Sequence, residues 1–153
     1  MQALELKVPP PAVAALLAVA MWLSSRFGPS VELSLLTRSI AFAILVFAGA
    51  AMGVAGNVAF KRAQTTPNPF KPQLASSLVT SGIYRYTRNP MYVGLFLVLL
   101  GWAAFLCTAF ALLGPLAFVA YIARFQVIPE ERVLVAKFGA AYSEYVARVR
   151  RWL

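Results

Sequence analysis

Three long tracts without any charged residue constrain this chain more than any other feature. They span residues 8–25, 39–60 and 89–123 of a 153-residue sequence that is 61% hydrophobic and 12% charged. Soluble domains carry about 25% charged residues, and a helix that crosses a bilayer needs about 20 mostly apolar residues. We therefore expect an all-α polytopic membrane protein that forms a single domain over residues 1–153.

The lengths of the tracts predict four transmembrane helices, at about residues 10–26, 39–60, 90–107 and 109–127. The third tract is too long for one span, and we expect it to form a helical hairpin that turns near Cys107-Thr108. Gly114-Pro115 would then lie inside the fourth helix as a kink, which membrane helices tolerate.

The positive charges predict how these spans are oriented. Four spans place both termini and the 61–89 loop on one side of the bilayer. The opposite side carries only Arg26 and Arg38, whereas the other 12 of the 14 Lys and Arg residues lie on the first side. The positive-inside rule makes the first side cytoplasmic. We therefore expect an integral protein of the inner or cytoplasmic membrane, with both termini and its functional site on the cytoplasmic face.

The net charge of +9 does not indicate nucleic-acid binding. The cations flank the predicted spans, where anionic lipid headgroups attract them, and no nucleic-acid-binding motif accompanies them. The expected partners are the lipid bilayer and a lipophilic small molecule.

The absence of histidine excludes several kinds of site. With no histidine and a single cysteine, Cys107, the chain cannot form a Ser-His-Asp triad, a Cys-His dyad or a Cys/His zinc cluster. No metal is expected. Any chemistry must depend on carboxylates, arginines, tyrosines and a bound cofactor.

A cationic, aromatic segment precedes the third span. Asn89-Pro90 predicts a helix start, with Asn as N-cap and Pro in the first turn. The free N–H groups of that turn, together with Arg85 and Arg88, suit an anion. The same pattern is also typical of an ordinary helix start at a membrane surface.

The C-terminal segment has the pattern of an amphipathic cytoplasmic helix. Pro129 followed by Glu130 and Glu131 predicts its start. Apolar and aromatic residues then recur at helical spacing: Leu134, Phe138, Tyr142, Tyr145, Val149 and Trp152. Gly139 can bend this helix. The two acids complement the helix dipole, or they hold hydroxyls, an ammonium or a sulfonium beside a membrane pocket.

Three glycines in the second tract, Gly49, Gly53 and Gly56, have the spacing of a small-residue helix contact. Such positions also let a cofactor approach the backbone. Helix packing is the favoured interpretation.

These segments together carry a family resemblance. Residues 87–94 read Thr-Arg-Asn-Pro-Met-Tyr-Val-Gly, residues 128–134 read Ile-Pro-Glu-Glu-Arg-Val-Leu, and residues 138–145 read Phe-Gly-Ala-Ala-Tyr-Ser-Glu-Tyr. Over residues 40–153, the chain resembles the isoprenylcysteine carboxyl methyltransferase and phospholipid methyltransferase group of integral membrane enzymes. The isoprenylcysteine enzymes have Arg-His-Pro at the turn, whereas Asn89 makes this chain more similar to the phospholipid N-methyltransferases.

The resemblance implies a methyltransferase that uses S-adenosylmethionine and a lipophilic or membrane-embedded acceptor. It implies that the cofactor is bound by Tyr84, Arg88, Asn89, Pro90, Tyr92, Gly94, Glu130 and Glu131. It places Tyr142 and Tyr145 in a closing helix near the acceptor. We further expect Arg85 and Arg124 to orient an anionic acceptor, and the residues closest to catalysis to be Arg88, Glu131 and Arg124.

Two other functions are compatible with four apolar helices: a small membrane transporter and a non-catalytic membrane scaffold. A transporter would normally carry an ionisable residue in mid-membrane, and residues 39–60 and 89–123 contain none. The sequence fixes neither the acceptor, nor whether O, N or S is methylated, nor the oligomeric state.

Overall fold

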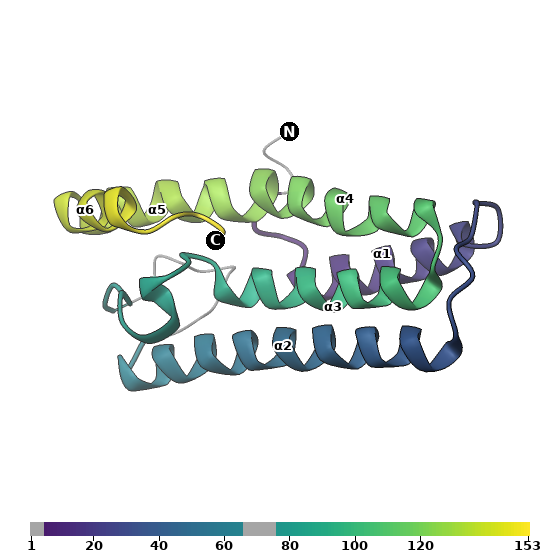
Figure 1. The fold of residues 1–153 in the computed structure, drawn as a ribbon. Coiled ribbons are helices and arrows are strands. Elements are labelled where there is room, and N and C mark those ends of the chain that lie inside the picture. The colour runs from purple at the N-terminus through teal and green to yellow at the C-terminus, as the bar shows by residue number, and fades with distance from the viewer. Residues whose placement is uncertain (1–4, 66–75) are drawn as a thin grey trace.

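The computed structural model describes residues 5–65 and 76–153, and helices make up its regular structure (Figure 1). In chain order they are α1 (Pro10–Ser24), α2 (Leu35–Arg62), the 3-10 helix η3 (Gly82–Arg85), α3 (Pro90–Leu106), the 3-10 helix η4 (Ala109–Leu112), α4 (Leu113–Ile122), the π-helix η5 (Ala123–Val127), α5 (Ile128–Phe138) and α6 (Ala140–Arg148). The all-α prediction is confirmed for the described residues, where an isolated bridge between Ser30 and Thr108 is the only β pairing. The proline-rich part of the predicted 61–89 loop, residues 66–75, lies outside them.

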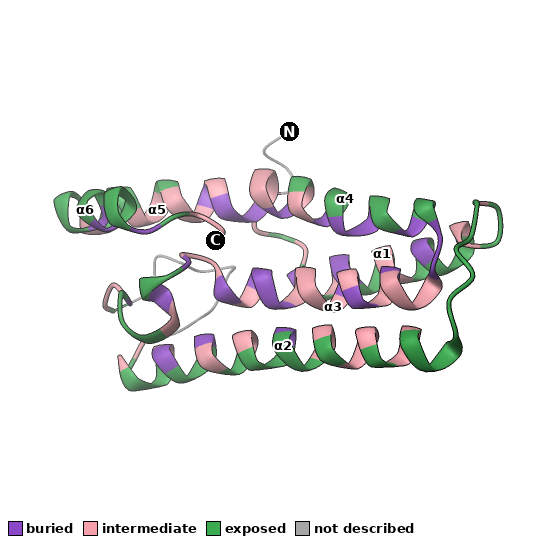
Figure 2. Cartoon of the chain, in the orientation of Figure 1, coloured by how far each residue is buried: buried purple, intermediate pink, exposed green. Residues whose placement is uncertain are grey.

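The helices pack around α3. It lies against α2 on one side and against α1 and α4 on the other, and α1 also packs on α4 (Figure 1). Leu99, Phe118 and Ile122 are fully buried where α3 and α4 face the interior. Figure 2 shows the buried residues gathered between these helices, whereas much of α2 is exposed.

Two helical stretches are long and apolar enough to cross a membrane, Leu35–Arg62 and Ala109–Phe138. The helices α1 and α3 are apolar but have 15 and 17 residues. At about 1.5 Å per residue they are shorter than a hydrocarbon core of about 30 Å. Large apolar side chains of α2 such as Ile44, Phe47 and Val54 are exposed, which is the surface that a membrane helix presents to lipid.

The predicted hairpin turn at Cys107-Thr108 is confirmed, because α3 ends at Leu106 and Cys107 adopts a left-handed conformation with φ of 52°. The predicted kink at Gly114-Pro115 is wrong. Both residues lie in the first turn of α4, where proline fits because its missing N–H has no partner to lose.

The predicted helix start at Pro129 is confirmed to within one residue, because α5 begins at Ile128 with Pro129 in its first turn, but α5 is not a separate helix. The helices α4, η5 and α5 run as one continuous rod (Figure 1). Proline cannot donate to the carbonyl four residues earlier and its ring clashes with it, and the chain accommodates this by a π-turn. Ile128 N–H donates to Ala123 O, five residues back.

The C-terminal amphipathic helix is present, but it is broken into α5 and α6 at Gly139, whose φ is 51°. The predicted stripe faces the protein. Tyr142, Tyr145 and Val149 are buried together and pack against Leu78 and Leu134. Beyond α6 the chain turns back toward the start of α3 (Figure 1).

Candidate functional site

A cavity of about 330 Å³ opens at the end of the bundle where α3 begins and where α5 and α6 meet the 77–85 segment. This volume is in the range of small-molecule sites. Its charged lining consists of two acids and one arginine among apolar and aromatic side chains. The lining residues are Pro10, Pro11, Asn57, Phe60, Ser77, Leu78, Val79, Tyr84, Arg88, Asn89, Met91, Tyr92, Leu95, Val127, Glu130, Glu131, Leu134, Tyr142 and Tyr145.

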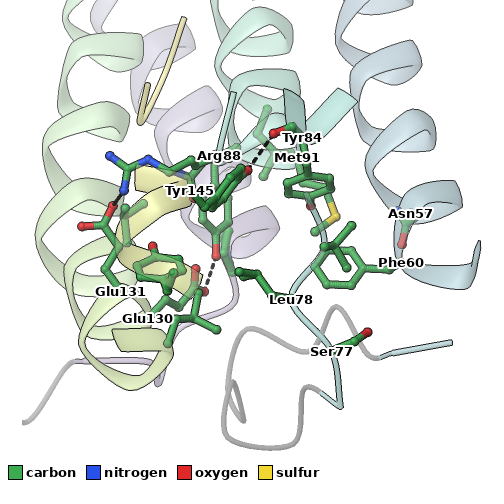
Figure 3. A pocket seen from close by; sticks show the side chains of 18 of the residues that line it. Asn57, Phe60, Ser77, Leu78, Tyr84, Arg88, Met91, Glu130, Glu131 and Tyr145 are labelled. Carbon is green, nitrogen blue, oxygen red and sulfur yellow. Dashed lines mark hydrogen bonds and ion pairs between the residues drawn. The ribbon is translucent and has the colours of Figure 1, made fainter. Parts of the chain in front are cut away.

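Arg88 and Asn89, which precede α3 and are called the arginine corner, meet Glu130 and Glu131 of α5, the acid pair, in this cavity (Figure 3). Arg88 Nη1 lies 2.8 Å from Glu131 Oε1, and both side chains are largely buried. Arg151 joins the same carboxylate with Nε 3.0 Å from Oε1 and Nη2 2.7 Å from Oε2. Glu131 is therefore held by two guanidinium groups, and these hydrogen bonds raise the pKa of Arg151 above its usual range.

Glu130 has a different environment from its neighbour. Among the described residues its carboxylate accepts one hydrogen bond, from the Tyr92 hydroxyl at 2.6 Å. Glu130 therefore keeps acceptor capacity toward the cavity, whereas both oxygens of Glu131 already accept hydrogen bonds from arginines. The Arg88 Nε atom is buried and has no hydrogen-bond partner within the described parts of the chain. Glu130 and Arg88 both line the cavity, so a carboxyl acceptor and an unpartnered N–H donor lie on residues of its wall.

Asn89 is not the side-chain cap that its position predicts. Its side chain makes no capping hydrogen bond to α3, and its Nδ2 donates instead to Arg151 O at 2.9 Å. The Arg88 backbone N–H likewise donates to Arg150 O at 3.1 Å. The C-terminal residues are therefore bound to the arginine corner through backbone carbonyls, which places Arg151 beside Glu131.

Tyr145 connects α6 to the 3-10 turn before α3, and three tyrosines in this region have raised pKa values. The Tyr145 hydroxyl donates to Tyr84 O at 2.7 Å, a buried contact visible in Figure 3. Burial raises the pKa of both Tyr84 and Tyr145, so each hydroxyl stays protonated and remains a donor. Burial also raises the pKa of Tyr142, and the nearby Glu131 carboxylate raises it further.

Four of the predicted site residues do not line the cavity. Pro90 is buried at the first turn of α3, and Gly94 packs against the backbone of α2. Arg85 is exposed on η3. Arg124 Nη1 lies 2.7 Å from Glu5 Oε1. The two arginines expected to orient an acceptor are therefore not placed at the cavity by the structure.

The structure also shows contributors that the sequence prediction missed. Arg151 holds Glu131, and Pro10 and Pro11 of α1 form part of the wall. The basic pair Arg150-Arg151, between Val149 and Trp152 of the amphipathic stripe, is a usable sequence signal for Arg151. Nothing in the apolar sequence around Pro10 indicates that it shares a cavity with α5 residues more than a hundred positions later.

Comparison with known proteins identifies the family of the chain. A protein of Haemophilus influenzae described as uncharacterized is 44% identical over 63 residues, which cover 41% of this chain and all of that protein. No solved structure matches the chain. The model of the phospholipid methyltransferase family matches residues 36–141, which include the arginine corner and the acid pair. The chain therefore belongs to the phospholipid methyltransferase family.

Proposed function

We propose that this protein transfers a methyl group from S-adenosylmethionine to a lipophilic acceptor in the membrane, of the phospholipid-amine or isoprenylcysteine-carboxylate type. One observation carries the proposal. In a chain of this family, Arg88 and Glu131 form a 2.8 Å ion pair at the edge of a cavity that Glu130 also lines. Two segments far apart in the sequence are thereby joined at one ligand-sized site.

The residues around the cavity fit the charges of this cofactor. S-adenosylmethionine supplies an electrophilic methyl group on a positively charged sulfur, and it also carries an ammonium, a carboxylate and ribose hydroxyls. The lining contains one more acid than arginine, and a cationic ligand would favour the ionised form of that additional acid. Glu130 would accept from the ammonium or a hydroxyl, and the unpartnered Arg88 Nε would donate to the carboxylate.

Such a transfer depends on alignment and exclusion of water more than on acid–base groups. This agrees with a chain that has no histidine. Tyr92, Tyr142 and Leu134 supply aromatic and apolar walls that keep water away from the reacting atoms. The exposed apolar side chains of α2 support a lipid setting. We place the protein in the cytoplasmic membrane with four spans and the cavity at the inner face.

The test is transfer of an isotopically labelled methyl group. Membranes containing the protein are incubated with methyl-labelled S-adenosylmethionine, and the lipid extract is analysed by mass spectrometry. We expect label in a lipid-soluble product, and less label with the Glu130→Gln variant at a donor concentration near the wild-type dissociation constant. If the purified protein binds no S-adenosylmethionine, the proposal fails and a transporter or a scaffold becomes the better interpretation. Binding without any labelled product would favour the scaffold.

A further inference from the structure

The residues before α1 make an unusual set of contacts for a segment outside the family match, which begins at residue 36. Leu6 N–H donates to Phe125 O at 3.0 Å, and Gln126 Nε2 donates to Val8 O at 2.8 Å. Glu5 contacts two arginines. We call Glu5, Leu6 and Val8 the N-terminal clamp. Immediately after it, Pro10 and Pro11 line the candidate cavity.

The clamp satisfies two polar groups of the π-turn η5, the Phe125 carbonyl and the Gln126 amide nitrogen. Pro129 cannot donate to Phe125 O, the carbonyl four residues earlier, and Leu6 N–H occupies that acceptor instead. Gln126 is completely buried, so its amide would be costly without the Val8 carbonyl. The π-turn therefore depends on a segment that lies more than a hundred residues away in the sequence.

Glu5 adds charge to the same contact. Its Oε1 lies 2.7 Å from Arg124 Nη1, and its Oε2 lies 2.6 Å from Arg132 Nη2. Arg124 lies on the π-turn and Arg132 on α5, so one carboxylate bridges the residues before and after the acid pair. The ion pair with Glu5 also explains why Arg124 does not line the cavity.

A π-turn controls the direction of every side chain that follows it. It inserts one residue into the helix, and one residue corresponds to about 100° of rotation about the axis. Glu130 and Glu131 come directly after this turn, so its geometry decides whether their carboxylates face Tyr92 and Arg88. A contact that holds the geometry of the π-turn therefore also holds the direction of the Glu130 and Glu131 side chains.

We propose that Glu5 is a positioning residue of the site: by bridging Arg124 and Arg132 it holds the π-turn in the form that directs Glu130 and Glu131 into the cavity. The inference rests on the proposed function for the identity of the ligand, but the clamp itself exists without any ligand. It assigns a role to a segment that the family match does not cover.

The test combines two measurements on the full chain in detergent. Hydrogen exchange without ligand, followed on peptides from residues 5–9 and 123–128, reports the clamp. Affinity for S-adenosylmethionine reports the acid pair. For Glu5→Gln we expect exchange in both peptides to become about threefold to tenfold faster and the dissociation constant to rise about threefold or more. The affinity is measured well below the unfolding temperature.

Glu32→Gln is the matched control, because Glu32 is exposed at the opposite end of the bundle and has no ion-pair partner within the described residues. It should change neither quantity. Arg132→Gln is a second variant, since Arg132 is exposed and its loss removes one of the two bridges. It should move both quantities in the same direction as Glu5→Gln, and it replaces that variant if Glu5→Gln does not fold.

The two proposals fail in different ways. Unchanged exchange in Glu5→Gln overturns the clamp even if methyl transfer is established. Faster exchange with unchanged donor affinity overturns the positioning role, because the clamp would then only stabilise the fold. A wild-type chain that binds no donor ends both the proposed function and the positioning role, and the exchange data then decide the clamp alone.

Discussion

Arg88 and Glu131 lie 43 residues apart in the chain and form an ion pair of 2.8 Å. This contact joins the start of α3 to α5 and closes one edge of the cavity. Arg151 then binds both oxygens of the same carboxylate, at 3.0 and 2.7 Å. One acid thereby connects three separate segments, whereas the adjacent Glu130 is left with a tyrosine partner.

Glu131→Gln should destabilise the protein. The substitution removes the charge that the Arg88 and Arg151 guanidinium groups share, and an uncompensated buried cation is costly. We expect a loss of about 2 kcal/mol, measured as a lower unfolding temperature in detergent. Glu144→Gln is the control, because Glu144 is exposed on α6. Equal unfolding temperatures for the two variants would contradict a structural role for Glu131.

Glu130→Gln should change ligand binding more than stability. Its carboxyl group has acceptor capacity toward the cavity, and a neutral amide cannot become the anion that a bound ammonium or sulfonium favours. We expect S-adenosylmethionine to bind about tenfold more weakly, with an unfolding temperature close to that of wild type. Titration calorimetry measures the affinity. If Glu130→Gln binds normally, the charge that holds the donor lies elsewhere in the cavity.

The features that the sequence predicts well are those set by local pattern. The charge-free tracts correspond to helices, the turn falls at Cys107-Thr108, and the stripe containing Tyr142 and Tyr145 packs inward. The arginine corner and the acid pair line one cavity, although only the family resemblance, not spacing or periodicity, linked them. The helices and the inward-facing stripe follow directly from hydrophobic burial at helical spacing.

The features that it does not predict depend on tertiary partners. Pro129 looks like a helix start because proline usually ends the preceding helix, but Leu6 supplies the donor that lets the helix continue as a π-turn. Asn89 looks like a cap, but the Arg151 carbonyl competes for its amide. The sequence suggests that Arg124 is free to bind an acceptor, but in the structure it forms an ion pair with Glu5.

Tyr145→Phe should destabilise the contact between α6 and η3. The Tyr145 hydroxyl donates to Tyr84 O at 2.7 Å in a buried setting, and removal leaves that carbonyl without its donor. A loss of about 1 kcal/mol is expected. Tyr86→Phe serves as the control, because the Tyr86 side chain is 73% exposed. Thermal unfolding of the two variants side by side measures the difference, and a similar loss in both would argue against the hydrogen bond.

The contribution of Glu5 should depend on pH in a defined direction. Hydrogen bonds from Arg124 and Arg132 lower the pKa of the Glu5 carboxyl from its ordinary value of 4.5. A lowered carboxyl pKa gives stability that is complete above the unfolded value and is lost as the pH falls through the folded value. The difference in unfolding temperature between wild type and Glu5→Gln should therefore be constant near neutral pH and shrink below pH 4.5. A difference that persists into strong acid would mean that Glu5 acts through its size and not its charge.

Gly94→Ala should separate α2 from α3. The helices approach each other at two glycines: a Cβ on Gly94 would lie 2.6 Å from Gly49 O, and a Cβ on Gly49 would lie 2.5 Å from Gly94 O. These contacts are to backbone, which cannot move as a side chain can, so we expect a loss of about 1–3 kcal/mol.

The matched control is Gly53→Ala, because a Cβ there meets nothing within 4 Å. It should be neutral or stabilise α2 by about 0.5–1 kcal/mol through higher helix propensity. Since α3 carries Tyr92 into the cavity, Gly94→Ala should also weaken donor binding, whereas Gly53→Ala should not. Opposite changes in stability from the same chemical substitution would show that close helix packing, and not glycine flexibility, is what Gly94 provides.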